Sequence, residues 1–264
     1  MDMKVMTFNL RVDLPQDGAN SWPHRIKKVS SIIKKHQPIV MGTQEGLLYM
    51  IEALRKDWPD YHWIGEGRSG GMTDEFCAIF YDHRKLEVVE SAQFWLSEKP
   101  DVPNSISWES DFPRVCTWGH FRFKKEPYQE FIHYNTHLDH ISQSAREHGI
   151  HLISEKLNEQ HRKKKLPVIL TGDFNSEPDD PVVRFLRGEA ELFDRSANLQ
   201  DSFIKLEGTF RKTFHGFQGG KEGGPIDYIF TTRDVEVVKS EIDNSEVNGA
   251  YPSDHYPVIT TLKF

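Results

Sequence analysis

Short runs of apolar, β-branched and aromatic residues recur along the whole chain, and turn-forming residues bound most of them. Such runs are typical of β-strands. We predict strands at residues 5–10, 39–43, 77–81, 86–94, 117–123, 131–136, 168–171, 228–231 and 256–262. The chain has no internal repeat and no long linker rich in proline, glycine or serine, so its 264 residues are predicted to form a single domain, residues 1–264.

Helical patterns separate some of these runs. Residues 25–36 place apolar side chains at helical spacing, residues 144–164 repeat the pattern and end in a basic turn, and residues 47–58 stop before Pro59. Helices and strands are therefore intermixed, with long strand-rich stretches. This order predicts an α/β protein in which two sheets pack together and helices cover them outside.

The composition excludes several classes of protein. With 37% hydrophobic and 28% charged residues the chain is neither disordered nor fibrous, and no stretch reaches the roughly 20 apolar residues of a membrane helix. The first ten residues lack a secretory pattern and only Cys77 and Cys116 are present, so we expect a reduced, cytoplasmic protein with no membrane partner. A net charge of −7 disfavours nonspecific binding of nucleic acid but leaves room for a local basic cleft.

Polar side chains stand at the ends of several predicted strands. The segments are TFNLR, GTQEG, YNTHLDH, LTGDFNSEP, GPIDYIF and YPSDHYPVI, with Asn9, Glu45, Asn135, His137, Asp173, Asn175, Asp227, Asp254 and His255. Because a strand sends successive side chains to opposite faces, its end is a rigid platform for a few aimed groups. A lone Asp or Asn after a strand is more often a turn former than a catalyst, and His137 alone is also compatible with a satisfied buried histidine. Together they predict one polar site assembled from the whole sequence.

These segments, in this order, resemble the endonuclease/exonuclease/phosphatase superfamily. That superfamily includes deoxyribonuclease I, abasic-site endonucleases, deadenylases, sphingomyelinases and inositol polyphosphate 5-phosphatases. The resemblance runs from TFNLR to SDHYPV, and its HGF and IDYIF segments look closer to a bacterial branch near the deadenylase-like members than to deoxyribonuclease I. It implies a four-layer α/β/β/α sandwich of two packed mixed sheets flanked by helices, with the active site at one edge of the sheets.

The resemblance also implies a metal site. Glu45 matches the principal metal-binding glutamate, Asn9 the asparagine beside it, and Asp254 the aspartate that completes the metal environment. Carboxylate and amide oxygens suit Mg²⁺, with Mn²⁺ as a second candidate. The sequence has no cluster of histidine and cysteine at zinc spacing, so zinc is the less natural metal.

The other matched residues are expected to act on the phosphate ester and on water. Asp173 is placed to deprotonate the attacking water, and Asn175 to orient it and contact the phosphate. His255, held by Asp227, is expected to be cationic and to stabilise the pentavalent phosphate, while His137 donates a second hydrogen bond to the same oxygens.

Two further residues are assigned by the same resemblance. Glu75 resembles the glutamate that pairs with the second active-site histidine, here His137, in deoxyribonuclease I. Arg114 stands where some members place an arginine that contacts phosphate. Asp139 and His140, in HLDH, have no general counterpart in the family.

The substrate is left open among three classes. The acidic balance and the lack of a long basic surface favour a phosphoesterase for a small phosphorylated metabolite such as a sugar phosphate. The alternative is a nuclease, exonuclease, endonuclease or deadenylase-like, acting on DNA or RNA. A noncatalytic binding module that kept the fold is the third class, and the intact polar set argues against it.

Overall fold

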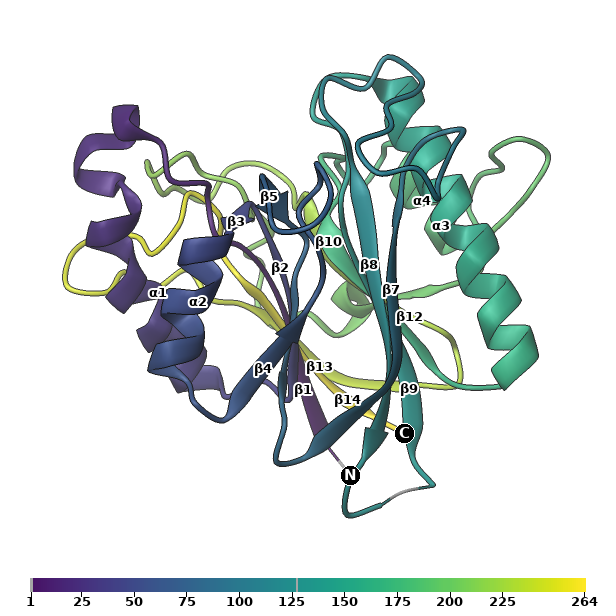
Figure 1. The fold of residues 1–264 in the computed structure, drawn as a ribbon, viewed down its shortest axis with the longest axis horizontal. Helices are drawn as coiled ribbons and strands as arrows, with labels where there is room; N and C mark the ends of the chain where they lie inside the picture. The colour runs from purple at the N-terminus through teal and green to yellow at the C-terminus, as the bar shows by residue number, and fades with distance from the viewer. Residues whose placement is uncertain (1, 127) are drawn as a thin grey trace.

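Two six-stranded mixed sheets form the centre of the protein (Figure 1), which is described here from a computed structural model covering residues 2–126 and 128–264. The strands are β1 (Asp2–Asn9), β2 (Val40–Gln44), β3 (Gly46–Leu47), β4 (Tyr61–Ile64), β5 (Glu75–Phe76), β6 (Ile79–Asp82), β7 (Leu86–Trp95), β8 (Val115–Phe123), β9 (Glu130–His137), β10 (Val168–Asp173), β11 (Gln200–Asp201), β12 (Asp227–Thr231), β13 (Glu236–Ile242) and β14 (Val258–Lys263). The first sheet has the order β13–β14–β1–β2–β6–β4 and the second β11–β12–β10–β9–β8–β7, while β3 and β5 form a separate two-stranded ribbon.

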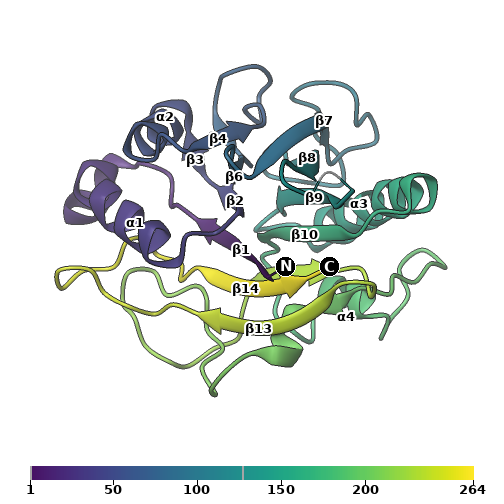
Figure 2. The same cartoon turned by 90° about the horizontal axis from the view of Figure 1, so that it is seen from below.

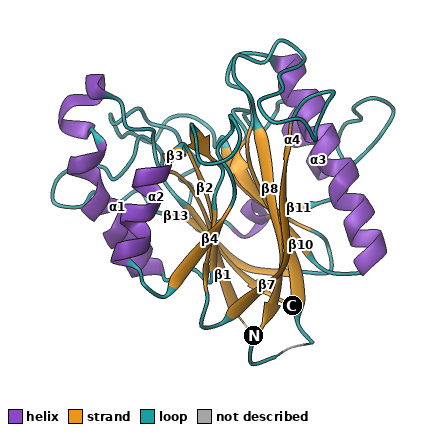
Figure 3. Cartoon of the chain, in the orientation of Figure 1, coloured by secondary structure: helices purple, strands orange, loops and turns teal. Residues whose placement is uncertain are grey.

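Helices cover the outer face of each sheet (Figures 2 and 3). They are α1 (Trp22–His36), α2 (Leu48–Asp57), α3 (Gln143–Lys164) and α4 (Pro181–Arg187), with 3₁₀ turns at Pro15–Asn20 and Ser202–Lys205. The first helix ends where the sequence predicts, at His36, and Gln37 takes a left-handed conformation after it. None of the helices in residues 2–126 and 128–264 is both long enough and apolar enough to span a bilayer.

The hydrophobic core is divided into layers by the two sheets. Val5 and Ile169 belong to a cluster between the sheets, whereas the next residues, Met6 and Leu170, belong to the clusters under the helices. This alternation follows from the period of two along a strand. Helices α1 and α2 pack on the first sheet, and α3 and α4 on the second. The predicted four-layer α/β/β/α sandwich is confirmed.

The elements that sequence patterns miss lie mostly at the edges of the sheets. Strands β13 and β4 are the two edges of the first sheet. Half-exposed edge strands carry charged and polar side chains that hide their apolar alternation, and β13 also has a bulge between Val237 and Lys239. The predicted strand 77–81 is corrected as well, because the chain forms β5 at Glu75–Phe76 and β6 only from Ile79.

Candidate active site

Strand register aligns three of the predicted site residues. Strands β9 and β10 are parallel with His137 opposite Asp173, and β10 and β12 are antiparallel with Asp173 opposite Asp227. Residues paired in register project to the same face of a sheet. The three side chains therefore form a row across the second sheet, where β9 and β10 end and β12 begins.

The first sheet supplies Asn9 and Glu45 to the same place. Asn9 ends β1, in register with the last residue of β2, and Glu45 follows β2 with a left-handed φ of 61°. The Asn9 side-chain NH₂ donates to Glu45 Oε1 (2.8 Å) and to Asp173 Oδ2 (3.0 Å), so it joins the two sheets. Its Oδ1 accepts the backbone N–H of Arg11 at 2.9 Å. In this geometry the NH₂ of Asn9 bridges two carboxylates, and its Oδ1, which accepts one hydrogen bond, keeps a second lone pair. The oxygen-ligand role expected for Asn9 stays a prediction.

The C-terminal loop brings Asp254 to the end of β1. Ser253 Oγ donates to the backbone carbonyl of Asn9 at 2.7 Å. The guanidinium of Arg25, fully buried in α1, donates to the carbonyls of Leu10 and Pro252, among others, and so ties the same two segments together. Burial raises the pKa of Asp254, and the nearby charge of Glu45 raises it further. Two carboxylates 209 residues apart in the sequence thus lie close enough to repel each other.

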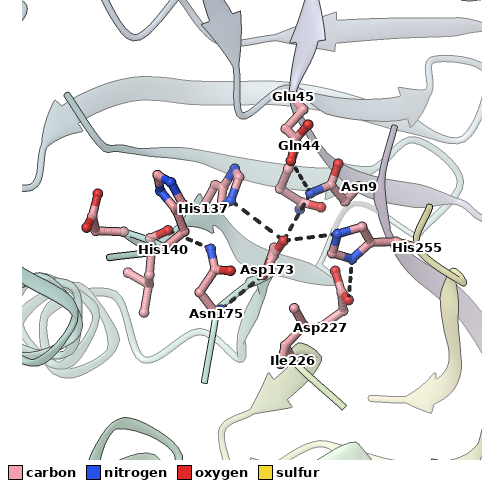
Figure 4. A network of polar contacts seen from close by, with 12 residues as sticks. Asn9, Gln44, Glu45, His137, His140, Asp173, Asn175, Ile226, Asp227 and His255 are labelled. Carbon is pink, nitrogen blue, oxygen red and sulfur yellow. Dashed lines mark hydrogen bonds and ion pairs between the residues drawn. The ribbon is translucent and has the colours of Figure 1, made fainter. Parts of the chain in front are cut away.

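Asp173 is the centre of the site, as Figure 4 shows. Its Oδ2 lies 3.6 Å from His137 Nε2 and 3.7 Å from His255 Nε2, and its Oδ1 accepts the backbone N–H of Asn175 at 3.0 Å. Asn175 has a left-handed φ of 48°, and its side-chain NH₂ donates to the carbonyl of Leu138. Burial, together with the charge of Asp227, raises the pKa of Asp173. A carboxylate with a raised pKa is a suitable proton acceptor near neutral pH.

The two histidines of the site differ in charge. Burial alone would favour neutral His255, but the carboxylates of Asp227, 2.8 Å from its Nδ1, and Asp173 outweigh burial and raise its pKa to about 10. Burial lowers the pKa of His137 well below the usual value, and the positive charges of Arg114 and His255 add to this effect. At neutral pH the site therefore holds one imidazolium and one neutral imidazole.

These groups surround a pocket of about 280 Å³. Its lining residues are Arg11, Glu45, Arg68, Glu75, Arg114, His137, His140, Asp173, Asn175, Phe214, Ile226, Asp254 and His255. All the predicted site residues line it except Asn9, Asp227 and Asn135. Asn9 and Asp227 hydrogen-bond to lining residues from behind. Sequence reasoning missed Arg11, Arg68, His140 and Ile226. Three of them, Arg11, His140 and Ile226, stand within three residues of a predicted site residue, which is the one signal available for them.

The predicted pairing of Glu75 with His137 requires correction. Within the part of the chain that the structure describes, the ion-pair partner of Glu75 is Arg68, with 2.8 Å between Arg68 Nη2 and Glu75 Oε1. Glu75 does line the pocket, and burial raises its pKa to about 7. Arg114 also lines the pocket, where its Nη2 lies 3.0 Å from His140 Nδ1 and its Nε 3.4 Å from Asp139. Asn135, in contrast, turns into the interior and hydrogen-bonds Gln44 between the sheets.

The donor set fits a hard divalent cation. Ligand atoms of Glu45, His137 and Asp173 lie within 4.8 Å of one another, and Asp254 adds a further carboxylate beside Glu45. Mutually repelling carboxylate oxygens of this kind suit Mg²⁺ or Mn²⁺, because these ions prefer oxygen ligands. Among the residues described, Cys77 and Cys116 lie buried outside the pocket lining, so no thiolate joins the set.

Comparison with known proteins agrees with this geometry. The sequence model described as the "Endonuclease/Exonuclease/phosphatase family" matches residues 6–255. The chain belongs to this family. It is therefore a metal-dependent phosphoesterase, a hydrolase of ester bonds.

Solved structures of the family match the whole chain. A mannosyl-6-phosphatase from Bacteroides thetaiotaomicron is 34% identical, with a TM-score of 0.90 over 99% of this chain and 100% of that one. A family protein from Bacteroides vulgatus is 33% identical, with a TM-score of 0.90 over 100% of this chain and 99% of that one. The human Nocturnin catalytic domain, at 18% identity and a TM-score of 0.76, shares the fold.

Two curated relatives come from Drosophila melanogaster. "Protein angel" is 28% identical over 237 residues, which cover 86% of this chain and 64% of that protein. "Nocturnin" is 24% identical over 290 residues, which cover 92% of this chain and 42% of that protein. The chain therefore spans less than two thirds of the length of either relative.

Proposed function

We propose that residues 1–264 act as one catalytic domain, a Mg²⁺-dependent phosphatase for a small phosphorylated metabolite, with sugar phosphates as the favoured class. The observation that carries the proposal is the similarity, over the whole chain, to a protein named mannosyl-6-phosphatase. The size of the pocket supports it. Pockets for drug-sized ligands measure roughly 300–1,000 Å³, so a volume of about 280 Å³ favours a smaller ligand.

In this proposal Glu45 and Asp254 hold the metal, and Asn9 keeps Glu45 in place through its side-chain hydrogen bond. Mn²⁺ is a substitute with the same preference for oxygen. A bound divalent cation neutralises the negative charge that develops on the phosphate and on the leaving oxygen, which lowers the barrier by several kcal/mol.

The protein's own groups bind the ester and move the proton. Asp173 accepts a proton from the attacking water, and its position is fixed by Asn9 and by the backbone of Asn175. His255, kept cationic by Asp227, donates through Nε2 to the phosphate oxygens and stabilises their growing charge. His137 supplies a second hydrogen bond from the opposite side of Asp173 (Figure 4). The side-chain amide of Asn175, with Arg114, completes the phosphate contacts.

The test is a phosphate-release assay with Mg²⁺ across sugar phosphates, nucleotides and short oligonucleotides. We expect release from a sugar phosphate, abolished by EDTA and lowered at least ~10²-fold in both Asp173→Ala and His255→Ala with the fold intact. Near wild-type rates in both variants would refute the site. Cleavage of oligonucleotides alone, weakening steeply with salt, would instead establish the nuclease alternative, because contacts to a nucleic-acid backbone release counterions. No Mg²⁺-dependent hydrolysis of any ester would favour the binding module.

A further inference from the structure

One wall of the active-site pocket includes three side chains, Arg68, Glu75 and His140, that the proposed chemistry does not use. Arg68 and Glu75 form an ion pair of 2.8 Å there, and Arg114 and His140 continue the wall. This wall adjoins the reacting groups, because Arg68 and Glu75 line the same cavity as Glu45 and His137. An ester whose phosphate contacts His137 therefore has its alcohol portion within reach of Arg68 and Glu75.

The ion pair is held in place by the backbone around it. The N–H of Arg68 donates to the carbonyl of Glu75 at 2.8 Å, and the indole N–H of Trp95 donates to the carbonyl of Arg68 at 2.7 Å. Close packing of the loop needs Gly67, where an added Cβ would lie 1.6 Å from a backbone oxygen. The ring of Phe112 covers the guanidinium of Arg68, with 4.5 Å from the ring centroid to Cζ. Groups fixed in this way lose little entropy when a ligand binds.

The charges of this wall are already balanced. Arg68 has two carboxylate partners, Asp74 at 3.0 Å and Glu75 at 2.8 Å, and Arg114 has Asp139 at 3.4 Å. Two guanidinium groups facing three carboxylates leave no surplus positive charge for a second phosphate. The wall suits an uncharged ligand with hydroxyl groups, since a hydroxyl both donates and accepts, and a guanidinium beside a carboxylate offers both partners.

We propose that Arg68 and Glu75 bind hydroxyl groups of the alcohol portion of the substrate, so that the pocket selects polyhydroxylated phosphate esters. This inference rests on the proposed function and assigns its substrate preference to two residues outside the reacting centre. A site that hydrogen-bonds a substrate hydroxyl discriminates against an analogue without it, because the polar groups of the site are then left unpaired.

The experiment compares kcat/KM for mannose 6-phosphate, which carries hydroxyls, and p-nitrophenyl phosphate, which carries none on its leaving group. For both Arg68→Met and Glu75→Gln we expect kcat/KM on mannose 6-phosphate to fall about 10- to 100-fold, as expected for the loss of a charge-assisted hydrogen bond. The ratio of the two kcat/KM values, sugar ester over aryl ester, is expected to fall at least about tenfold. Arg122→Met is the matched control, because Arg122 pairs with Glu87 and Glu130 away from the pocket, and it should leave that ratio unchanged.

The outcomes separate this inference from the proposed function. If the wild type hydrolyses both esters and both variants keep the wild-type ratio, the hydroxyl-binding role is overturned while the phosphatase stands. An equal loss on both esters also overturns it, because it would place the ion pair in the reaction itself. If the wild type hydrolyses neither ester with Mg²⁺, the proposed function fails and the inference fails with it. Circular dichroism shows whether each variant is folded. If Arg68→Met does not fold, the result for Glu75→Gln decides, because glutamine has nearly the same shape as glutamate.

Discussion

Replacing Asp227 with asparagine should remove the charge that controls His255 while keeping the shape of the site. Asp227 Oδ2 lies 2.8 Å from His255 Nδ1, and both side chains are buried. Burial opposes the cation, yet Asp227 and Asp173 raise the pKa of His255 from 6.5 to about 10. Since one pKa unit corresponds to about 1.4 kcal/mol, the folded site stabilises the His255 cation by roughly 5 kcal/mol relative to a histidine in water. Asparagine supplies no charge, so burial should bring the pKa of His255 down toward neutrality.

The assay is the pH dependence of kcat, with the ester that the release assay identifies. We expect Asp227→Asn to lower kcat by about 10²-fold or more near neutral pH, because the imidazolium is lost where charge develops. The residual activity should decline as the pH rises above about 6, whereas in the wild type we expect that decline only toward pH 10. Folding stability depends on pH in the same direction as activity. The contribution of the His255 cation to the free energy of unfolding is complete below pH 6.5 and is lost as the pH rises through about 10.

A matched control distinguishes the loss of this ion pair from the general effect of replacing a buried aspartate. Asp201 is a buried aspartate of the same sheet whose partner is Arg187, and it lies outside the pocket. Asp201→Asn should lower the free energy of unfolding and leave the pH profile of kcat unchanged. Wild-type turnover together with an unchanged profile in Asp227→Asn would refute the role assigned to the pair.

Three other substitutions test the framework of the site. In Gly42→Ala the new Cβ would lie 2.2 Å from Thr171 Oγ1, so the free energy of unfolding in urea should fall by about 1–3 kcal/mol. An unchanged urea midpoint would show that the two sheets move apart at this point without cost, against this expectation. Burial alone would raise the pKa of Asp243, but hydrogen bonds from His36 and other donors outweigh burial and lower it. The Asp243 carboxylate therefore stabilises the fold above about pH 4, and this contribution is lost as the pH falls. Asp243→Asn should cost about 1.5–3 kcal/mol near pH 7 and flatten the acid limb of the melting temperature, and an acid limb as steep as that of the wild type would contradict this. Arg25→Met should raise the Mg²⁺ concentration for half-maximal activity about 10- to 100-fold, as losses of outer-shell support do; wild-type Mg²⁺ dependence would dissociate Arg25 from the metal site.

The layers and the polar clusters follow from the sequence for a physical reason. Buried strands are read as continuous apolar runs, because both of their faces pack in the interior, and their polar residues stand where each strand ends, as in GDFN at the end of β10. Register does not follow in the same way. The row of His137, Asp173 and Asp227 depends on how β9 and β12 align with β10, which no single segment specifies.

The corrections at Glu75 and the burial of Arg25 have a common cause. The surroundings of each side chain depend on contacts that no local sequence pattern specifies. The contacts of Arg25 come from distant segments, and the partner of Glu75 comes from an irregular loop. Arg25 sits in an amphipathic helix like a surface arginine, and only the folded chain surrounds it with backbone carbonyls. The partner of Glu75 is decided by the loop that folds Arg68 back onto it, and that loop has no periodic pattern to predict its shape.

The proposals above share one claim, a metal centre at Glu45 and Asp254. A crystal structure of the protein with Mn²⁺, located by its anomalous scattering, tests this claim most directly. The ion is expected to be bound by carboxylate oxygens of both Glu45 and Asp254, and Glu45→Gln should abolish the peak and the hydrolysis together. An ion bound elsewhere, with hydrolysis retained in Glu45→Gln, would contradict a metal centre at the meeting point of the two sheets.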